Sequence, residues 1–309
     1  MEHVSNYSRL FTNVKPHTVE GIKIYDVDDS WYVDQNYSAI PEEEHVIWSR
    51  LFTKQKEFLN YYASKEYLEG LTALNLIQRR LPEFRYLSRK MRAASGWQLI
   101  PVAGFLDEEV FFSLNAAKKF PATVIIRGSH RFRTKYSNGE IKNEDGYTPE
   151  PDIYHDVRGH APFLMNREYG NFLAKMGDIG VVLIKDDRKL GSELVSHNLK
   201  RLQNFAWWTY EFGVMKKQLT TDLLRQRPND IKFEIYGAGI ISSLSEVTNV
   251  VACAKGESRK SQFIPFNIEE VMLTIFDYSD IQDRYFVIDS MESLYSEFYS
   301  NRELFFYEG

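Results

Sequence analysis

The strongest chemical feature of this 309-residue chain is a pair of histidines, His155 and His160, within the stretch YTPEPDIYHDVRGH. Imidazoles bind metal ions, but residues five apart lie about 140° from each other on a regular α-helix. Both rings face one ion only if the helix widens between them, as a π-bulge does, and Gly159 and Pro162 favour such an irregularity. Because the chain has seven histidines, the pair alone is equally consistent with two ordinary polar side chains at a helix start.

A third ligand is needed to hold an ion, and Glu211 is the candidate. It lies in NFAWWTYEFGVM, an apolar run in which a carboxylate is costly to bury unless it is paired or bound to a metal. The alternative is an exposed acid on the polar side of an amphipathic helix. Two histidines and one carboxylate form the ligand set of non-haem iron oxygenases, and a zinc hydrolase is another use of that set. Asp152 and Glu150 are candidates to orient the histidines by hydrogen bonds from outside.

Composition excludes several classes of protein. A net charge of −5 and a pI near 5.9 give no general attraction to nucleic acid or anionic membranes. Cys253 is the single cysteine, so a disulfide within the chain and a thiolate metal cluster are both excluded, and a reducing compartment is the natural setting. The first residues lack the apolar core of a signal peptide, and no apolar run is long enough to span a membrane. We therefore expect a cytoplasmic protein.

The hydrophobic pattern predicts a mostly helical α+β fold with small strands at its periphery. Residues 1–40 are expected to form an irregular N-terminal extension, and residues 41–309 a single catalytic domain that carries the site. Helices are predicted over residues 41–64, 81–95, 107–120, 199–217, 241–252 and 267–275, with a last helix from Ser290. Strands are predicted over residues 97–103, 122–127, 231–239 and 284–289, with a hairpin over 131–143 that turns at Asn138 and Gly139.

Four separated parts of the sequence resemble the pterin-dependent aromatic amino acid hydroxylases, especially the short bacterial phenylalanine 4-hydroxylases. In chain order they are IPVAGFL with FPATVIIR, YTPEPDIYHDVRGHAPFL, WWTYEFG with YGAGIISSLSE, and YFVIDS. They span roughly residues 97–290 and follow the order of the family, which is far more specific than the histidine pair. The resemblance is to the catalytic domain of the family and does not reach residues 1–40.

The resemblance implies that His155, His160 and Glu211 bind Fe(II). It also places Arg127 where the family holds the carboxylate of the substrate, a group that a guanidinium binds through two parallel hydrogen bonds. Contacts to the substrate are implied for four further side chains, which on their own would be taken as turn, cap or core residues: Thr148, Trp207, Phe212 and Ser242.

A tetrahydropterin, such as tetrahydrobiopterin, is the second cofactor that the resemblance implies. It would lie against GFLDEEVFF, where backbone groups of Gly104, Phe105 and Leu106 approach it and the ring of Phe111 stacks on it. On its own, Phe111 would be an ordinary core residue of an amphipathic helix. The reduced pterin supplies two electrons, so that O₂ hydroxylates the ring of an aromatic amino acid.

Phenylalanine is the expected substrate and tyrosine the product, because Trp207 is typical of relatives that act on phenylalanine. Tryptophan hydroxylated at its 5-position, or hydroxylation at another ring position, is the alternative, since Ala206 stands where relatives carry a tyrosine near the iron and leaves a larger pocket. A non-catalytic binding protein is a further alternative, against which the intact ligand set and Arg127 weigh. A monomer or dimer is expected, with neither nucleic acid nor a membrane as partner.

Overall fold

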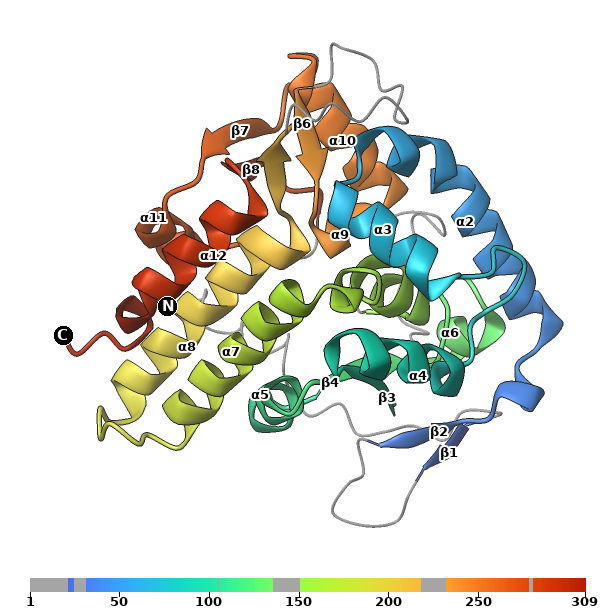
Figure 1. The fold of residues 1–309 in the computed structure, drawn as a ribbon, viewed down its shortest axis with the longest axis horizontal. Coiled ribbons are helices and arrows are strands. Elements are labelled where there is room, and N and C mark those ends of the chain that lie inside the picture. Colours follow the sequence, from blue (N-terminus) through green and yellow to red (C-terminus); the bar gives the residue numbers. More distant parts are fainter. Residues whose placement is uncertain (1–21, 25–31, 105, 136–150, 218–231, 278–279) are drawn as a thin grey trace.

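The computed structural model of the chain describes residues 22–24, 32–104, 106–135, 151–217, 232–277 and 280–309. Helices dominate, and short strands lie toward the rim (Figure 1). The α-helices are α2 (Glu42–Tyr62), α3 (Lys65–Leu74), α4 (Phe84–Ser95), α5 (Glu108–Ala116), α6 (His130–Lys135), α7 (Arg167–Ile184), α8 (Ser192–Ala206), α9 (Ala238–Ile241), α10 (Leu244–Ala254), α11 (Ile268–Leu273) and α12 (Met291–Ser300). Two π-helices, Tyr154–His160 and Trp207–Glu211, interrupt this set, and short 3₁₀ turns occur at Tyr37–Ala39, Phe163–Met165 and Arg302–Phe305.

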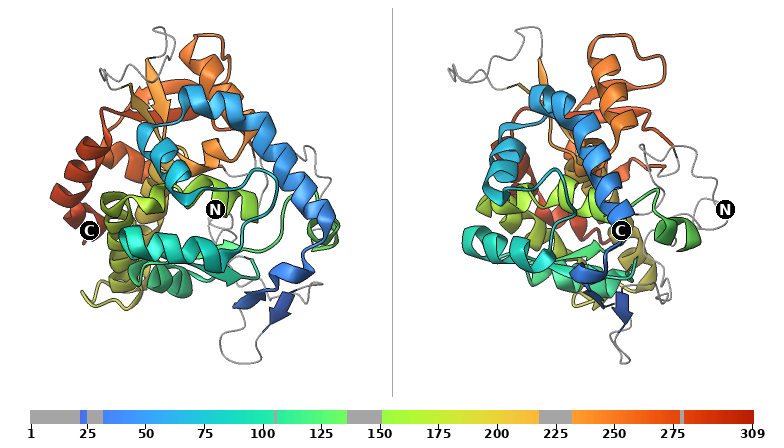
Figure 2. Two further views of the ribbon diagram at one scale, coloured as in Figure 1. Left: turned by 45° about the vertical axis from the view of Figure 1, so that its right-hand side comes forward. Right: turned by 90° about the vertical axis from the view of Figure 1, so that its right-hand side faces the viewer.

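The strands of the described residues form three small sheets. They are β1 (Ile22–Ile24), β2 (Val33–Gln35), β3 (Gln98–Val102), β4 (Lys119–Thr123), β5 (Val214–Lys216), β6 (Phe233–Ile235), β7 (Gln262–Pro265) and β8 (Arg284–Ile288). β1 and β2 pair antiparallel, β3 and β4 pair parallel, and the third sheet has the order β6-β5-β8-β7. In both views of Figure 2 the β1–β2 ribbon stays at the edge of the molecule, so helices build its centre.

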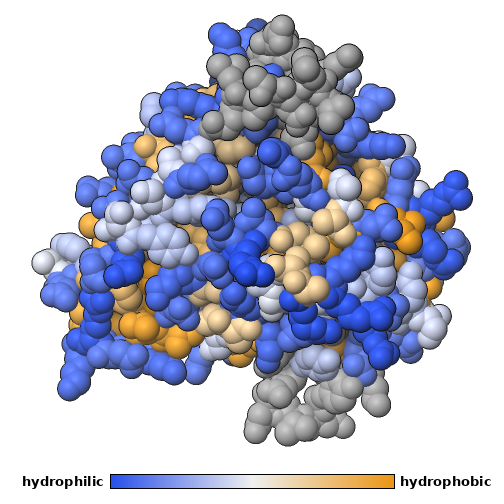
Figure 3. All heavy atoms as spheres, in the orientation of Figure 1, coloured by the Kyte–Doolittle hydropathy of each residue, from blue (hydrophilic) through white to orange (hydrophobic). Residues whose placement is uncertain are grey.

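One large apolar cluster forms the core that these helices share. α7 and α8 run side by side (Figure 1), and Phe172 of α7 meets Phe205 of α8 edge-on, with ring centroids 6.2 Å apart. The face drawn in Figure 3 is mostly hydrophilic, with scattered apolar side chains. Among the described residues, no helix combines the length and apolar character that crossing a membrane requires.

The expectation of a mostly helical α+β fold with one domain and small peripheral strands is confirmed. α2 begins with Glu42, Glu43 and Glu44, three acids that suit the positive end of the helix dipole. Ser290 is the N-cap of α12, and its side chain and that of Ser293 form a reciprocal capping box. Within the extension expected over residues 1–40, the described part contains β1 and β2, so it is not irregular there. The division at residue 40 stays a prediction.

The hairpin expected over residues 131–143 is wrong in its described part, because His130–Lys135 form helix α6. Ser129 caps this turn by accepting a hydrogen bond from the backbone N–H of Phe132. Arg131 then ties α6 to α2 through Nε, which lies 2.6 Å from Oε1 of the buried Glu44. This long-range ion pair outweighs the local strand propensity. The turn expected at Asn138 and Gly139 lies outside the described residues.

The strand expected over residues 122–127 is displaced toward the N-terminus, since β4 ends at Thr123. The backbone N–H of Thr123 donates to Oδ2 of Asp156 at 2.7 Å, and that of Arg127 donates to Oδ2 of Asp152 at 2.7 Å. These two backbone N–H groups therefore donate to carboxylates instead of to a neighbouring strand, and β4 ends early. The neighbouring helix expected over residues 107–120 is correspondingly shorter and ends at Ala116.

The helix expected over residues 199–217 is also wrong at its C-terminal end. α8 gives way to the second π-helix at Trp207, and the chain leaves it at Glu211 to enter β5 at Val214. The tail of this segment pairs with β6 and β8, a tertiary contact that a helical pattern does not reveal. α3, α7 and β7 were not predicted, although Ser64 and Asn166 cap the two helices with their side chains.

The buried ion pair between α2 and α6 makes a stability prediction. Glu44→Ala leaves the buried charge of Arg131 without its carboxylate, and we expect a loss of about 3–5 kcal/mol in the free energy of unfolding. Urea unfolding followed by circular dichroism measures it. The matched control is Glu42→Ala on the same helix, because the Glu42–Arg80 pair is exposed and should change stability by less than about 1 kcal/mol. Equal effects for the two variants would contradict this account.

Candidate metal centre

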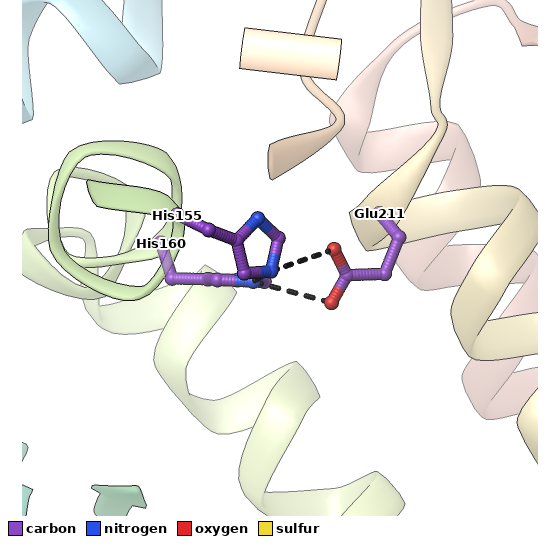
Figure 4. Close-up of side chains that lie close together, drawn as sticks. All are labelled: His155, His160 and Glu211. Carbon is purple, nitrogen blue, oxygen red and sulfur yellow. Dashed lines mark hydrogen bonds and ion pairs between the residues drawn. The ribbon is translucent and has the colours of Figure 1, made fainter. Parts of the chain in front are cut away.

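His155 and His160 lie on the first π-helix, which confirms the widening that their spacing requires. Their rings are perpendicular, with centroids 4.8 Å apart, and their Nε2 atoms lie 3.2 Å from each other. Figure 4 shows both side chains leaving one coil and reaching toward Glu211 on the opposite side. The backbone hydrogen bonds of this segment span five residues, so the turn is wider than in an α-helix and the two imidazoles converge.

Glu211 is the last residue of the second π-helix, so each ligand-bearing segment is a π-helix. Its Oε1 lies 3.1 Å from Nε2 of His160, and its Oε2 lies 3.5 Å from Nε2 of His155 (Figure 4). The side chain of His160 is 2% exposed, whereas those of His155 and Glu211 are 18% and 17% exposed. The cluster is thus closed on the His160 side and reachable from the other.

Helix α9 lies between the two π-helices and limits how closely they approach each other. A Cβ on Gly159 of the first π-helix would come within 2.9 Å of the carbonyl oxygen of Ala238. A Cβ on Gly237, which precedes α9, would come within 2.4 Å of the carbonyl oxygen of Glu211. Neither position has room for a larger side chain, so the backbones approach as closely as glycine allows.

The electrostatics of the cluster favour a neutral His155 ring beside an ionised Glu211. Burial lowers the pKa of His155 to about 4, and this effect outweighs the opposing influence of Glu211. Burial acts to raise the pKa of Glu211, but the two imidazoles that face it outweigh burial and hold the pKa below its ordinary value. Nδ1 of His155 lies 2.8 Å from Oγ of Ser242, which leaves Nε2 directed at the cluster.

The three side chains fit a metal ion. Their ligand atoms all lie within 4.8 Å of one another. Ligand atoms about 2.1 Å from a common ion and at right angles to each other lie about 3.0 Å apart, close to the 3.1, 3.2 and 3.5 Å between the atoms here. Nδ1 of His160 has no hydrogen-bond partner among the described residues, and its ring packs against Phe120 with centroids 4.8 Å apart.

Asp152 supports the first π-helix through its backbone, whereas the second ring nitrogen of His155, for which Asp152 was a candidate partner, meets Ser242. Its Oδ1 accepts a hydrogen bond from the backbone N–H of His155 at 3.0 Å, and its carboxylate pairs with the guanidinium of Arg127. Burial acts to raise the pKa of Asp152, but the charge and hydrogen bonds of Arg127 outweigh burial and lower it. Nη1 of Arg127 donates to the carbonyl oxygen of Ser242 at 3.0 Å. Arg127 therefore joins Asp152 to the residue that contacts His155.

Trp207 and Phe212 are brought together at the second π-helix. Their rings stack with centroids 4.6 Å apart, and Phe276 stacks on Trp207 at 4.1 Å and 8°. Phe212 is buried, and Trp207 is half-buried on the π-helix that ends at Glu211. These rings form an aromatic wall, defined here as Trp207, Phe212 and Phe276.

The segment expected to contact a pterin is described except for Phe105. Gly104 is buried, and Leu106 and Phe111 belong to a small apolar cluster with Val102 and Leu114. Their contact with a pterin stays a prediction. Thr148 and Glu150, expected beside the substrate and the ligands, lie outside the described residues.

Sequence reasoning missed a buried polar network behind the aromatic wall. The carboxylate of Glu246 accepts hydrogen bonds from the hydroxyl of Tyr285 and from the backbone N–H of Gln282, and Oε1 of Gln282 accepts one from Nε1 of Trp207. Glu246 stands within the segment YGAGIISSLSE, which resembles the family. Gln282 offered no motif or spacing by which it could have been found.

Comparison with known proteins agrees with this geometry. A family described as "Biopterin-dependent aromatic amino acid hydroxylase" matches residues 33–302. The chain belongs to this family. A phenylalanine-4-hydroxylase of Caulobacter vibrioides is 33% identical over 267 residues, which are 85% of this chain and 76% of that protein.

Solved structures of phenylalanine hydroxylase from Chromobacterium violaceum share the fold of this family member. The structure with bound iron and phenylalanine has a TM-score of 0.71 and 29% identity, and covers 92% of this chain and 88% of its own. The structure with bound iron(III) and oxidized 7,8-dihydrobiopterin has a TM-score of 0.72 and 28% identity, with coverages of 91% and 88%.

Glu246 of this hydroxylase makes a pH prediction. Burial raises its pKa from the ordinary 4.5 to about 7, and this effect outweighs the hydrogen bonds from Tyr285 and Gln282, which lower the pKa. The folded chain then holds a proton that the unfolded chain releases, so this carboxyl lowers stability progressively as pH rises from about 4.5 to about 7. Glu246→Gln should flatten that fall, reducing the difference in Tm between pH 5 and pH 8 by roughly 5 °C.

Thermal unfolding at the two pH values measures the difference. The control is Glu193→Gln, an exposed acid on α8, which should keep the pH dependence of the unmodified protein. An unchanged pH dependence in Glu246→Gln would show that the carboxyl is ionised in the folded state.

Proposed function

We propose that this protein is a phenylalanine 4-hydroxylase that uses Fe(II), a tetrahydropterin and O₂ to convert phenylalanine to tyrosine. The observation that carries the proposal is the convergence of two imidazoles and one carboxylate at metal-ligand separations, on two π-helices. Relatives named phenylalanine-4-hydroxylase, and one solved with iron and phenylalanine, support it.

In this proposal His155, His160 and Glu211 hold the iron. Bound iron activates O₂, and the reduced pterin supplies the two electrons that the reaction consumes. The chain itself orients the ligands, because Ser242 holds Nδ1 of His155 and Asp152 holds its backbone N–H. The closed side at His160 limits the access of water to the reacting groups.

The proposed roles of the other predicted residues follow the same arrangement. Arg127 supplies the positive charge for the substrate carboxylate beside Ser242, and its pairing with Asp152 holds the guanidinium in place. Trp207 and Phe212 enclose the substrate ring, and Thr148 contacts the substrate. Gly104, Phe105, Leu106 and Phe111 contact the pterin, and Glu150 orients a ligand.

Tryptophan hydroxylation is the second candidate, and Ala206 is the observation that favours it. Its small side chain is only half-buried and adjoins Trp207 at the junction of α8 and the second π-helix. A bulkier substrate ring fits more readily beside a methyl group than beside a large side chain. Membership of the hydroxylase family speaks against a zinc hydrolase.

The metal ligands are tested by removing them. His155→Ala, His160→Ala and Glu211→Ala should each lower Fe(II) affinity by more than about a hundredfold, because even a residue that only orients a ligand is worth about 10–100-fold. Anaerobic loading with Fe(II), desalting and elemental analysis give the iron content. Glu193→Ala, an exposed acid on α8, should bind iron as the unmodified protein does. Full iron and full activity in Glu211→Ala would remove it from the ligand set.

The activity is tested with three substrates in parallel. The Fe(II)-loaded protein receives tetrahydropterin and O₂ with phenylalanine, tryptophan or tyrosine, and products are identified by chromatography and mass spectrometry. Tyrosine should form from phenylalanine with a kcat/KM at least about tenfold above that for tryptophan. A dominant 5-hydroxytryptophan product would select the second candidate. The absence of hydroxylated product from all three would overturn the proposal.

The setting and assembly are part of the same proposal. We infer a cytoplasmic protein from its single cysteine, Cys253, since a reducing compartment suits a chain that forms no internal disulfide. We infer a monomer or dimer. Light scattering of the purified chain measures its mass directly.

A further inference from the structure

The indole of Trp207 is held by a single buried amide. Its Nε1–H donates to Oε1 of Gln282 at 3.0 Å, and the side chain of Gln282 is almost completely buried. The other end of that amide donates to the carbonyl oxygens of Asp277 and Asp280 at 2.7 and 3.0 Å. One side chain thus joins the aromatic wall to the segment that follows α11.

Gln282 is itself fixed through its backbone. Its N–H donates to Oε1 of Glu246 at 3.0 Å, and its carbonyl oxygen accepts from Oγ of Ser261 at 2.7 Å. Asn249 donates to Ser261 and to the hydroxyl of Tyr285, which in turn donates to Glu246. The amide that receives the indole N–H therefore has a defined position relative to α10 and β8.

Trp207 differs from the other tryptophans that the structure describes. Trp48 and Trp208 donate to the backbone carbonyls of Ile77 and Thr274, and Nε1 of Trp97 has no partner among described residues. Of these four, Trp207 alone donates to a side chain. The orientation of its ring therefore depends on the identity of another residue.

We propose that Gln282 is a positioning residue for the aromatic wall, and that it sets the orientation of the Trp207 indole within its plane and with it the preference for phenylalanine over tryptophan. This inference rests on the proposed function of the site. Trp207 stands four residues before Glu211 on the same π-helix. A rotation of its ring changes the width of the space beside the metal ligands.

Stacking alone does not fix the indole in this way. Phe212 and Phe276 contact its faces at 28° and 8°, but stacked rings slide and turn in their common plane at little cost. The hydrogen bond to Gln282 is directional and removes that freedom. Without it, the buried N–H loses its partner, and the ring rotates to find another.

The test is a double-mutant cycle between Gln282→Met and Trp207→Phe. Methionine keeps the length of the side chain and removes its hydrogen bonds, and phenylalanine removes the indole N–H. Gln282→Met should raise KM for phenylalanine about fivefold with kcat within about twofold, and lower the phenylalanine-to-tryptophan ratio of kcat/KM about tenfold. In the Trp207→Phe background the same change should alter the ratio by less than about twofold.

A second measurement does not depend on activity. In protein labelled with 5-fluorotryptophan, the ¹⁹F signal that Trp207→Phe removes is assigned to Trp207. That signal should shift and broaden in Gln282→Met, whereas the other tryptophan signals should stay in place. Gln262→Met is the matched control, since Gln262 is exposed on β7 and the same substitution there should change neither the signal nor the ratio.

Gln282→Asn is a second variant, which keeps the amide but makes the side chain too short to reach the indole. It should also lower the phenylalanine-to-tryptophan ratio of kcat/KM. An unchanged ratio in both variants, or an equal fall in the Trp207→Phe background, would overturn the role of Gln282. Absence of hydroxylated product from the unmodified protein would instead count against the proposed function. The ¹⁹F measurement still decides whether Gln282 holds the indole in that case.

Discussion

The convergence of three donor atoms places the tightest constraint on this structure. Two come from one segment and the third from another some fifty residues later, and all must meet at separations near 3 Å. A regular α-helix would direct His155 and His160 to different sides. Each segment is wound as a π-helix instead, and its irregular hydrogen bonding is stabilised by contacts outside the helix.

Buried carboxylates provide much of that support. Asp152 and Asp156 lie on either side of His155 in the sequence and accept hydrogen bonds from the backbone N–H groups of Arg127 and Thr123. These bonds end β4 and connect the strand to the first π-helix. Arg127 compensates the charge of Asp152 at that point. The same residues therefore explain both the short strand and the fixed position of the histidines, so the local fold and the site are one arrangement.

The sequence revealed the ligand set because residue type and spacing are local properties. His155, His160 and Glu211 were predicted together with the widened helix, whereas the partner of the His155 ring is Ser242 and Asp152 holds the backbone N–H instead. The end of β4, the turn of helix α6 and the exit into β5 were not, because long-range partners decide them: Asp156, Glu44 and β8. Gln282 escaped notice for the same reason, since only the folded chain brings it to Trp207.

Helix α9 acts as a spacer between the two halves of the metal centre. Its thickness is set at the contacts of Gly159 and Gly237, where backbone meets backbone. The span between the imidazoles and the carboxylate is therefore governed by positions that touch no metal. A methyl group at either contact would lie less than 3 Å from a backbone oxygen, so the backbones would have to move apart. The spacing of His155, His160 and Glu211 therefore depends on two positions that carry no side chain.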